Sequence, residues 1–340
     1  MRPFDYERID DPLTATKVGH GAAARTPPTM ATTQFLAGGT TLLDLMKLDV
    51  MRPTRVIDIN GMRDAYAGIV VTPHALHLGA LAHMSEVADH PQVREQYPAI
   101  AQSLYLAASP QLRNMATLGG NVLQRTRCMY FRDPTWKHCN KRNPGSGCDA
   151  LDGINRKHAV LGTSEHCIAS YPGDFANVLI AFDARVEIAG RDGARTIPFA
   201  QLHREPGDTP HIETVLAPDD VITGFTIAAA PYTRRSLYLK IRDRQSYEFA
   251  LASAAVGLDL RDDNVNEARI ALGGVATRPW RSHEAEAALR GKPLTLETAQ
   301  AAARAAFASA VTHGENDHKP ELGRRTLVRA LLEAARMERT

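Results

Sequence analysis

The sequence predicts an α+β fold built from three consecutive parts. Strand and helix patterns alternate through the first half of the chain, whereas after about residue 231 three strand patterns precede two helical ones. The 340 residues are 44% hydrophobic and 23% charged, which is the composition of an ordinary globular protein. This length alone allows two domains, or one large domain with a satellite.

The first part alternates strand and helix. Short strands are predicted at residues 33–36 and 55–59, and a helix at residues 42–47 lies between them. Near the N-terminus, residues 19–24 superficially resemble a dinucleotide-binding fingerprint, but no apolar strand precedes them. We interpret these residues as a helix C-cap followed by a loop.

The second part mixes strands with several helices. A strand is predicted at residues 77–80, and helices are predicted from residue 84 and over residues 99–108. A further helix and strand share residues 175–190. The Pro- and Gly-rich residues 205–208 indicate a surface loop.

The third part combines an antiparallel sheet with helices. Strand patterns cover residues 237–241, 252–260 and 268–272, and helical spacing appears in residues 296–311 and 327–337. We expect both helices to pack on the sheet.

Two glycine pairs are candidates for phosphate binding. Gly38 and Gly39 lie between a strand and a helix and precede Thr40, while Gly119 and Gly120 follow a threonine. Glycine lets backbone N–H groups approach a ligand closely because it has no Cβ and tolerates positive φ. One such pair is more often a simple turn, but two together favour a cradle for a pyrophosphate.

All four cysteines lie in one basic, turn-rich window, at Cys128, Cys139, Cys148 and Cys167. A stretch with so few aliphatic residues needs a covalent or metal link to become ordered. The residue spacing leaves three alternatives: an iron–sulfur cluster, a pair of disulfides, or zinc, whose usual tight cysteine pairs are missing.

Histidines flank the cysteine window, at His138, His158 and His166. With four cysteines available as ligands, we expect these histidines at surface positions or in supporting contacts.

Charge and hydropathy exclude several classes of function. A formal net charge of +2 gives no electrostatic reason to expect nucleic-acid binding. No apolar run approaches the length that spans a bilayer, which is roughly 20 residues. The first residues lack the apolar stretch of a secretory signal, so we expect no signal peptide on this chain.

The glycine motifs resemble those of a known family. Residues 35–43 resemble the first flavin motif of the molybdenum hydroxylases, a family that includes xanthine dehydrogenase, aldehyde oxidoreductase and carbon monoxide dehydrogenase. Residues 108–121 are similar to the second motif almost residue for residue, and residues 238–242 and 272–276 resemble the C-terminal segment. The chain is therefore identified as a member of the FAD-binding subunits of this family, over nearly its whole length.

The resemblance implies a three-part FAD-binding fold. Two α/β subdomains hold the FAD, and a C-terminal α/β domain of antiparallel sheet and helices closes over it. The implied boundaries are residues 1–60 and 61–230 for the subdomains and 231–340 for the C-terminal domain. A cysteine insert is expected at about residues 122–172.

The resemblance also implies the cofactor-binding residues. In relatives the two Gly-Gly loops bind the pyrophosphate, an acidic residue matching Asp174 bonds the sugar or ribityl chain, and a lysine matching Lys240 lies near the isoalloxazine. The implied cofactor-binding residues are Leu36, Ala37, Gly38, Gly39, Thr40, Thr41, Leu42, Leu43, Ala108, Ser109, Leu112, Thr117, Gly119, Gly120, Asn121, Asp174, Ile222 and Lys240. No catalytic residue is expected on this chain.

The cysteine window departs from most of the family. Asn121 and Asp174 are 53 positions apart (174 minus 121), where most relatives have a short connection. Two branches have an insert of this kind with a [4Fe–4S] cluster: 4-hydroxybenzoyl-CoA reductase and the three-subunit periplasmic aldehyde oxidoreductases of bacteria. Residues 139–148 look like the second branch. The resemblance thus implies Cys128, Cys139, Cys148 and Cys167 as the ligands of one [4Fe–4S] cluster.

The implied function is electron transfer within an oxidoreductase complex. A large partner would hold the molybdenum cofactor and oxidise an aldehyde, a small partner would hold [2Fe–2S] clusters, and FAD on this chain would pass electrons to an external acceptor. The complex would be periplasmic through co-export with a signal-bearing partner, or else cytoplasmic. The alternatives are a flavin subunit of the xanthine dehydrogenase or hydroxybenzoyl-CoA reductase type, and a non-catalytic assembly scaffold linked through its cysteines.

Overall fold

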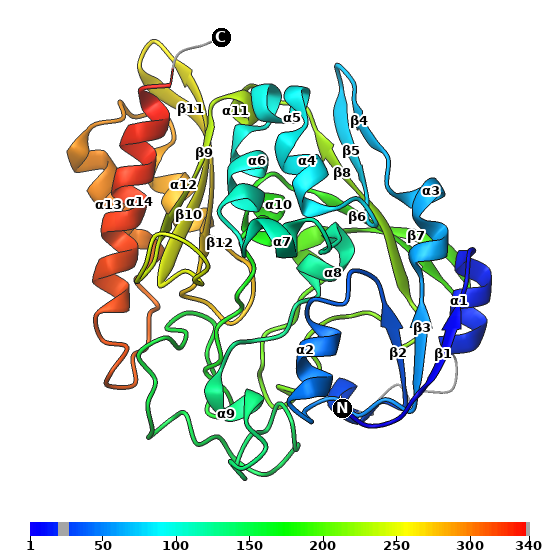
Figure 1. Cartoon of the computed structure of the whole chain (residues 1–340). Helices are drawn as coiled ribbons and strands as arrows, with labels where there is room; N and C mark the ends of the chain where they lie inside the picture. The colour runs from blue at the N-terminus through cyan, green and yellow to red at the C-terminus, as the bar shows by residue number, and fades with distance from the viewer. Residues whose placement is uncertain (20–26, 338–340) are drawn as a thin grey trace.

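A computed structural model of the chain describes residues 1–19 and 27–337. Within these residues three β-sheets follow one another along the chain, with helices around them (Figure 1). The α+β fold predicted from the sequence is confirmed. No helix in the described part of the chain is long and apolar enough to cross a bilayer.

The first sheet contains three parallel strands in the order β1-β3-β2. Its strands are β1 (Asp5–Arg8), β2 (Thr33–Leu36) and β3 (Arg55–Asp58), and its helices are α1 (Pro12–Gly19), η1 (Pro28–Met30) and α2 (Leu42–Lys47). The predicted strands and the predicted helix after the first glycine pair are confirmed. The sequence does not predict β1, because most of its side chains are exposed and show no apolar alternation. Helix α1 ends at Gly19, and the loop expected over residues 20–24 lies outside the described residues.

The second sheet contains five antiparallel strands in the order β4-β5-β8-β6-β7. They are β4 (Ile69–Val71), β5 (Ala75–Gly79), β6 (Arg185–Gly190), β7 (Gly193–Pro198) and β8 (Val221–Ala228). The helices of this part are η2 (Asn60–Met62), α3 (Arg63–Tyr66), α4 (Met84–Asp89), α5 (Pro91–Gln96), α6 (Pro98–Tyr105), α7 (Pro110–Arg113), α8 (Leu118–Val122), α10 (Phe175–Ala181) and η3 (Phe199–Gln201). The largest apolar core lies between this sheet and its helices, so the second glycine pair, inside α8, is built on a well-packed base.

The third sheet contains four antiparallel strands in the order β12-β11-β10-β9. Its elements are α11 (Pro231–Arg234), β9 (Ser236–Ile241), β10 (Ala252–Arg261), β11 (Asn264–Gly273), β12 (Trp280–Arg281), α12 (His283–Leu289), α13 (Leu296–Ala306) and α14 (Lys319–Ala335). Helix α14 packs on β9 and β10 as predicted, whereas α13 packs mainly on α12 and α14. Helix α14 also begins eight residues before its predicted start (327 minus 319), because a charged run with proline in its first turn hides the apolar spacing.

The cysteine segment, residues 124–173, connects α8 to α10 and lies along the lower edge of the molecule in Figure 1. Its one helix is α9 (Met129–Arg132). The segment contacts all three parts: Phe131 shares a core with α2, Leu161 shares one with the third sheet, and Tyr171 shares one with α6 and α10. Lys319, at the start of α14, donates to the carbonyls of Lys157, His158 and Gly274 at 3.0, 2.9 and 2.6 Å. The segment therefore packs against elements of all three parts of the chain.

Candidate functional site

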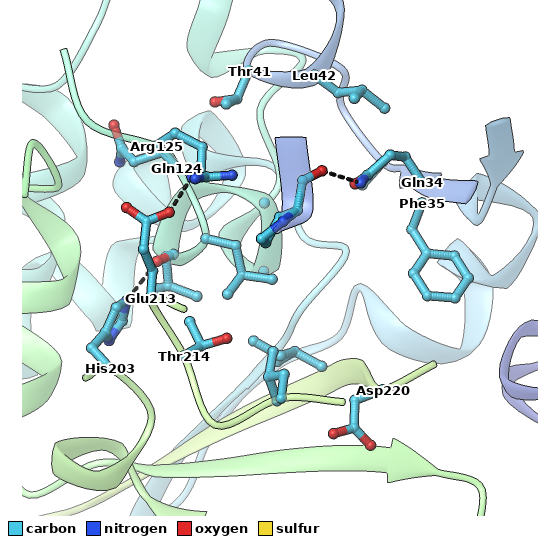
Figure 2. Close-up of a pocket in the computed structure, with 18 of the residues that line it drawn as sticks. Gln34, Phe35, Thr41, Leu42, Gln124, Arg125, His203, Glu213, Thr214 and Asp220 are labelled. Carbon is cyan, nitrogen blue, oxygen red and sulfur yellow. Dashed lines mark hydrogen bonds and ion pairs between the residues drawn. The ribbon is translucent and has the colours of Figure 1, made fainter. Parts of the chain in front are cut away.

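A cavity of about 370 Å³ lies where the first two parts of the chain meet the cysteine segment (Figure 2). Both glycine pairs line it, together with Thr40, Thr41 and Thr117. Residues 203–222 supply a second wall, and the cysteine segment supplies a third. This volume is in the range of pockets that hold small molecules and cofactors.

The two glycine loops touch each other through their backbones. A Cβ on Gly38 would lie 1.9 Å from the carbonyl oxygen of Met115, just before the second loop. Gly39 has a φ of +73°, which is the left-handed region that glycine tolerates best. Glycine is therefore required at both positions, first for the close approach and then for the turn.

The loops differ in the N–H groups that they offer. Among the described residues, no hydrogen bond is donated by the backbone N–H groups of residues 38–41. In the second loop, Gly119 donates to the carbonyl of Ala80 at 2.8 Å, and Gly120 donates to Oγ1 of Thr117 at 3.3 Å. The first loop thus has free N–H donors for a pyrophosphate, whereas the N–H groups of Gly119 and Gly120 in the second loop already donate hydrogen bonds within the protein.

Ten of the implied cofactor-binding residues line the cavity. They are Ala37, Gly38, Gly39, Thr40, Thr41, Leu42, Thr117, Gly119, Gly120 and Ile222. Of the others, Leu36 and Leu43 lie beneath the first loop, with side-chain atoms 3.1 and 3.0 Å from where a Cβ of Gly39 would be. The hydroxyl of Ser109 caps α7 by accepting from the N–H of Leu112 at 3.3 Å, and Ala108, just before it, has a φ of +49°.

Asp174 and Lys240 form a buried ion pair away from the lining of this cavity. Lys240 Nζ lies 2.7 Å from Asp174 Oδ2, and their side chains are 1% and 5% exposed. The hydroxyl of Tyr238 donates to Asp174 Oδ1 at 2.6 Å, and Lys240 also donates to the carbonyl of Leu106 at 3.2 Å. Asn121 Oδ1, just after the second glycine pair, is buried without a hydrogen-bond partner among the described residues. Their contacts with FAD stay predictions.

Three charged residues of the cavity wall are missed by the sequence interpretation. Oε1 of Glu213 lies 2.9 Å from Nζ of Lys141, and Oε2 of Glu213 pairs with Nε of Arg125 (Figure 2 shows Arg125 and Glu213). Burial alone would raise the pKa of Glu213, but Arg125 and Lys141 lower it below its usual range. Glu213 follows the stretch predicted to be a surface loop, and Lys141 lies in the basic run between cysteines. The role of these three residues becomes apparent only from the ion pairs that they form in the folded chain, and no pattern in the sequence predicts those pairs.

The four cysteines are free thiols, and they lie close enough together for several of them to raise one another's pKa. Cys139 and Cys148 face each other across an isolated antiparallel bridge. Burial, together with a smaller effect of neighbouring cysteines, raises the pKa of Cys128 and raises that of Cys148 to about 11. Four such thiols would lose their protons together only with a compensating positive charge close by.

The surroundings of the thiols also offer donors. Backbone N–H groups lower the pKa of Cys128, Cys139 and Cys148 against the larger effect of burial. His158 Nε2 lies 3.2 Å from Cys128 Sγ, while His138 and His166 are exposed and pair with aspartates. As the side chains stand, the described residues contain no group of three or more Cys, His, Asp or Glu that would hold a single metal ion. Within the part of the chain that the structure describes, the thiols come together without forming a site for a single metal ion.

Comparisons with known proteins agree with the fold. Residues 22–229 match the family model "FAD binding domain in molybdopterin dehydrogenase", and residues 237–338 match "CO dehydrogenase flavoprotein C-terminal domain".

Two relatives cover most of the chain. The aldehyde oxidoreductase FAD-binding subunit PaoB of Escherichia coli (strain K12) is 45% identical over 98% of this chain and 99% of its own length. The carbon monoxide dehydrogenase medium chain of Hydrogenophaga pseudoflava is 26% identical over 88% of each. Among solved structures, the carbon monoxide dehydrogenase of Hydrogenophaga pseudoflava that lacks the Mo-pyranopterin moiety has a TM-score of 0.74 at 26% identity, over 98% of this chain and 97% of the other.

Proposed function

The chain belongs to the FAD-binding subunits of the molybdenum hydroxylase family, and from this premise we propose that it is the electron-transfer flavin subunit of a molybdenum-dependent aldehyde oxidoreductase. The observation that supports the proposal most is a shared cavity. Glycine loops of the FAD-binding part form one side of it, and the cysteine segment forms another. The 45% identical relative is an aldehyde oxidoreductase subunit, which favours an aldehyde as the substrate of the complex.

The chain's own residues bind and orient FAD. The free N–H groups of residues 38–41 hold the pyrophosphate, and the close approach of Gly38 to Met115 fixes the width of the cradle. Arg125 lines the cavity with its Nη2 buried and unpartnered among the described residues, so it offers a donor to an anionic ligand. Bound FAD supplies electron exchange between the iron–sulfur partner and an external acceptor.

The cysteine segment is proposed to hold one [4Fe–4S] cluster on Cys128, Cys139, Cys148 and Cys167. A four-iron cluster separates its thiolates more widely than a single ion does, which fits thiols that converge without forming a single-ion site. The backbone N–H groups and the cations Lys141 and Arg142 stabilise negative charge on the sulfurs. The cluster supplies a one-electron redox centre and holds the segment together.

The partners are proposed to be a large subunit with the molybdenum cofactor and a small subunit with [2Fe–2S] clusters, in a periplasmic complex exported with a signal-bearing partner. Apolar side chains are exposed on and beside the cysteine segment, at Leu123, Met129, Trp136 and Ile154. An iron–sulfur partner docked there would cover them and lie near the cavity.

Cofactor analysis tests the proposal. The full chain, purified without oxygen, is expected to contain one FAD and about four iron atoms with acid-labile sulfide. Its visible spectrum should show flavin together with a broad absorption that bleaches on reduction. Flavin-replete protein with no iron would contradict the cluster, and protein with neither group would favour the assembly scaffold.

Activity and assembly test the division of labour. The chain expressed alone should not reduce a dye with aldehyde, whereas its complex with the large and small subunits should. Substantial aldehyde turnover by the isolated chain would contradict the proposal, as would a chain that stays monomeric when it is co-expressed with both partners. Cell fractionation of the complex tests the periplasmic location.

A further inference from the structure

The cysteine segment forms part of the wall of the FAD cavity. Arg125, Lys141, Cys167 and Ala169 all lie in the segment, and all four line the cavity. Cys167 is at once a proposed cluster ligand and a wall residue. A change in the conformation of the segment therefore changes the shape of the cavity.

Glu213 joins the segment to the cavity at two points. It binds Lys141 from the middle of the segment and Arg125 from its start, and Lys141 Nζ also donates to the carbonyl of Pro210 at 2.9 Å. The side chains of Arg125 and Lys141 are each 9% exposed, and that of Glu213 is 24% exposed, in a residue that lines the cavity. Two buried cations on one carboxylate fix its position, because leaving either cation unpaired is costly.

Besides Glu213, Arg125 contacts another residue of the cysteine segment, Phe131. Its guanidinium lies 5.0 Å from the centre of the Phe131 ring. Phe131 packs in one apolar cluster with Cys139 and with Leu45 and Met46 of α2, the helix that follows the first glycine loop. The orientation of Arg125 therefore depends on how the segment around Cys139 is packed.

We propose that the FAD site and the cysteine site are thermodynamically coupled through Glu213, so that a filled cysteine site orders Arg125 and Lys141 and strengthens FAD binding. This inference rests on the proposed cluster. Linkage then requires the converse, so that bound FAD strengthens retention of the cluster. Glu213 is a positioning residue here, because it acts on FAD through Arg125.

A double-mutant cycle on the full chain tests the coupling. Four proteins are compared: the unchanged chain, Cys148→Ser, Glu213→Gln, and the double variant. Cys148 does not line the cavity, so its loss reaches FAD only through the segment. FAD is removed and added back, its Kd is measured by flavin fluorescence, and iron is assayed in each sample.

The expected result is strong non-additivity. Cys148→Ser should lower iron content and raise the Kd for FAD about tenfold, whereas in the Glu213→Gln background the same change should raise it less than about twofold. Glu333→Gln, which breaks an exposed pair with Arg329 on α14, is the matched control and should leave the Kd unchanged. A second measurement needs no variant: removing iron from the unchanged chain with an oxidant and a chelator should speed FAD release about tenfold.

The outcomes separate the two proposals. Loss of iron with an unchanged Kd for FAD, or equal Kd increases in both backgrounds, would overturn the coupling and leave the cluster standing. An unchanged chain that contains no iron and binds FAD tightly would overturn both.

Discussion

The first glycine loop and the cysteine segment both face the cavity, yet they are shaped by different forces. The glycine loop lies between β2 and α2, and its geometry is set by the backbone, with Gly38 against the Met115 carbonyl. The cysteine segment contains one short helix, α9, and six of its backbone carbonyls accept hydrogen bonds from the buried side chains of Arg142 and Lys319. Arg142 alone donates to the carbonyls of Tyr130, Phe131, Asp133 and Trp136.

The two regions are therefore damaged by opposite kinds of substitution. Adding an atom damages the glycine loop, because the space is already filled by backbone. Removing a charge damages the cysteine segment, because buried carbonyls lose the donors that replace a regular hydrogen-bond ladder. Four substitutions test this contrast, in order of decreasing change in stability or flavin content.

The largest effect is expected for Gly38→Ala. The new Cβ would lie 1.9 Å from a backbone oxygen that cannot rotate away, so the two glycine loops must separate, and we expect flavin-free protein destabilised by about 3 kcal/mol. Gly119→Ala is the matched comparison, because its Cβ would meet Ala80 Cβ at 3.2 Å and needs only a small shift. The larger Gly119→Val should lose flavin as well. Flavin content and thermal unfolding are measured. If Gly38→Ala retained as much flavin as the unchanged chain, the close contact between the two loops would be contradicted.

Arg142→Leu should loosen the cysteine segment while the FAD-binding sheets stay folded. Four carbonyls lose a charged donor, which is worth about 3 kcal/mol after water replaces part of the loss. Hydrogen exchange should rise within residues 124–173 and stay unchanged in β6 and β8. Exchange that rises evenly across the chain would show that the segment does not open on its own.

Acid is expected to weaken the structure where α8 meets the cysteine segment, through His203. His203 Nε2 donates to the carbonyl of Val122 at 2.9 Å, and burial lowers its pKa to about 4. Between about pH 6.5 and 4 the unfolded chain binds a proton that the folded chain does not bind, so the free energy of unfolding falls as pH falls, by about 3 kcal/mol. Above pH 6.5 the ring is neutral in both states and the effect vanishes. His203→Gln keeps a donor for Val122 and should remove this part of the pH dependence in denaturant unfolding; a slope identical to that of the unchanged chain would refute the assignment.

The smallest effect is expected for Asp44→Asn. Oδ2 of Asp44, in α2, lies 3.1 Å from Nη1 of Arg127 and 2.8 Å from Nη1 of Arg132. Burial alone would raise the pKa of this carboxyl, but the two arginines hold it below its usual value. The pair is partly exposed, so we expect a loss of about 1 kcal/mol and a faster proteolytic cut in the cysteine segment. Asp49→Asn is the control, since its pairs with Arg2 and Arg52 are exposed and outside both regions. The same proteolysis rate in both variants would show that Asp44 does not join the segment to the glycine loop.

The sequence predicted the regular elements better than the site. Strand β2 and helix α2 have the predicted bounds because their apolar periodicity is local, and both glycine pairs line the cavity as expected. Glu213 could not be predicted, because its importance comes from Arg125 and Lys141, which are 88 and 72 positions away (213 minus 125 and 213 minus 141). The same reason hides β1: it pairs with β3 across about 50 residues and shows no apolar alternation of its own.

The position of Lys319 has a consequence for the order of events during synthesis. Its ammonium group binds the carbonyls of Lys157 and His158, yet it is translated 152 residues after Cys167 (319 minus 167). Domains form from the N-terminus as the chain emerges. All four thiols are therefore out of the ribosome well before the last helix can fasten the segment against the third sheet. The proposed cluster would have its easiest route of assembly during that interval, before the folding of α14 fixes the segment against the third sheet.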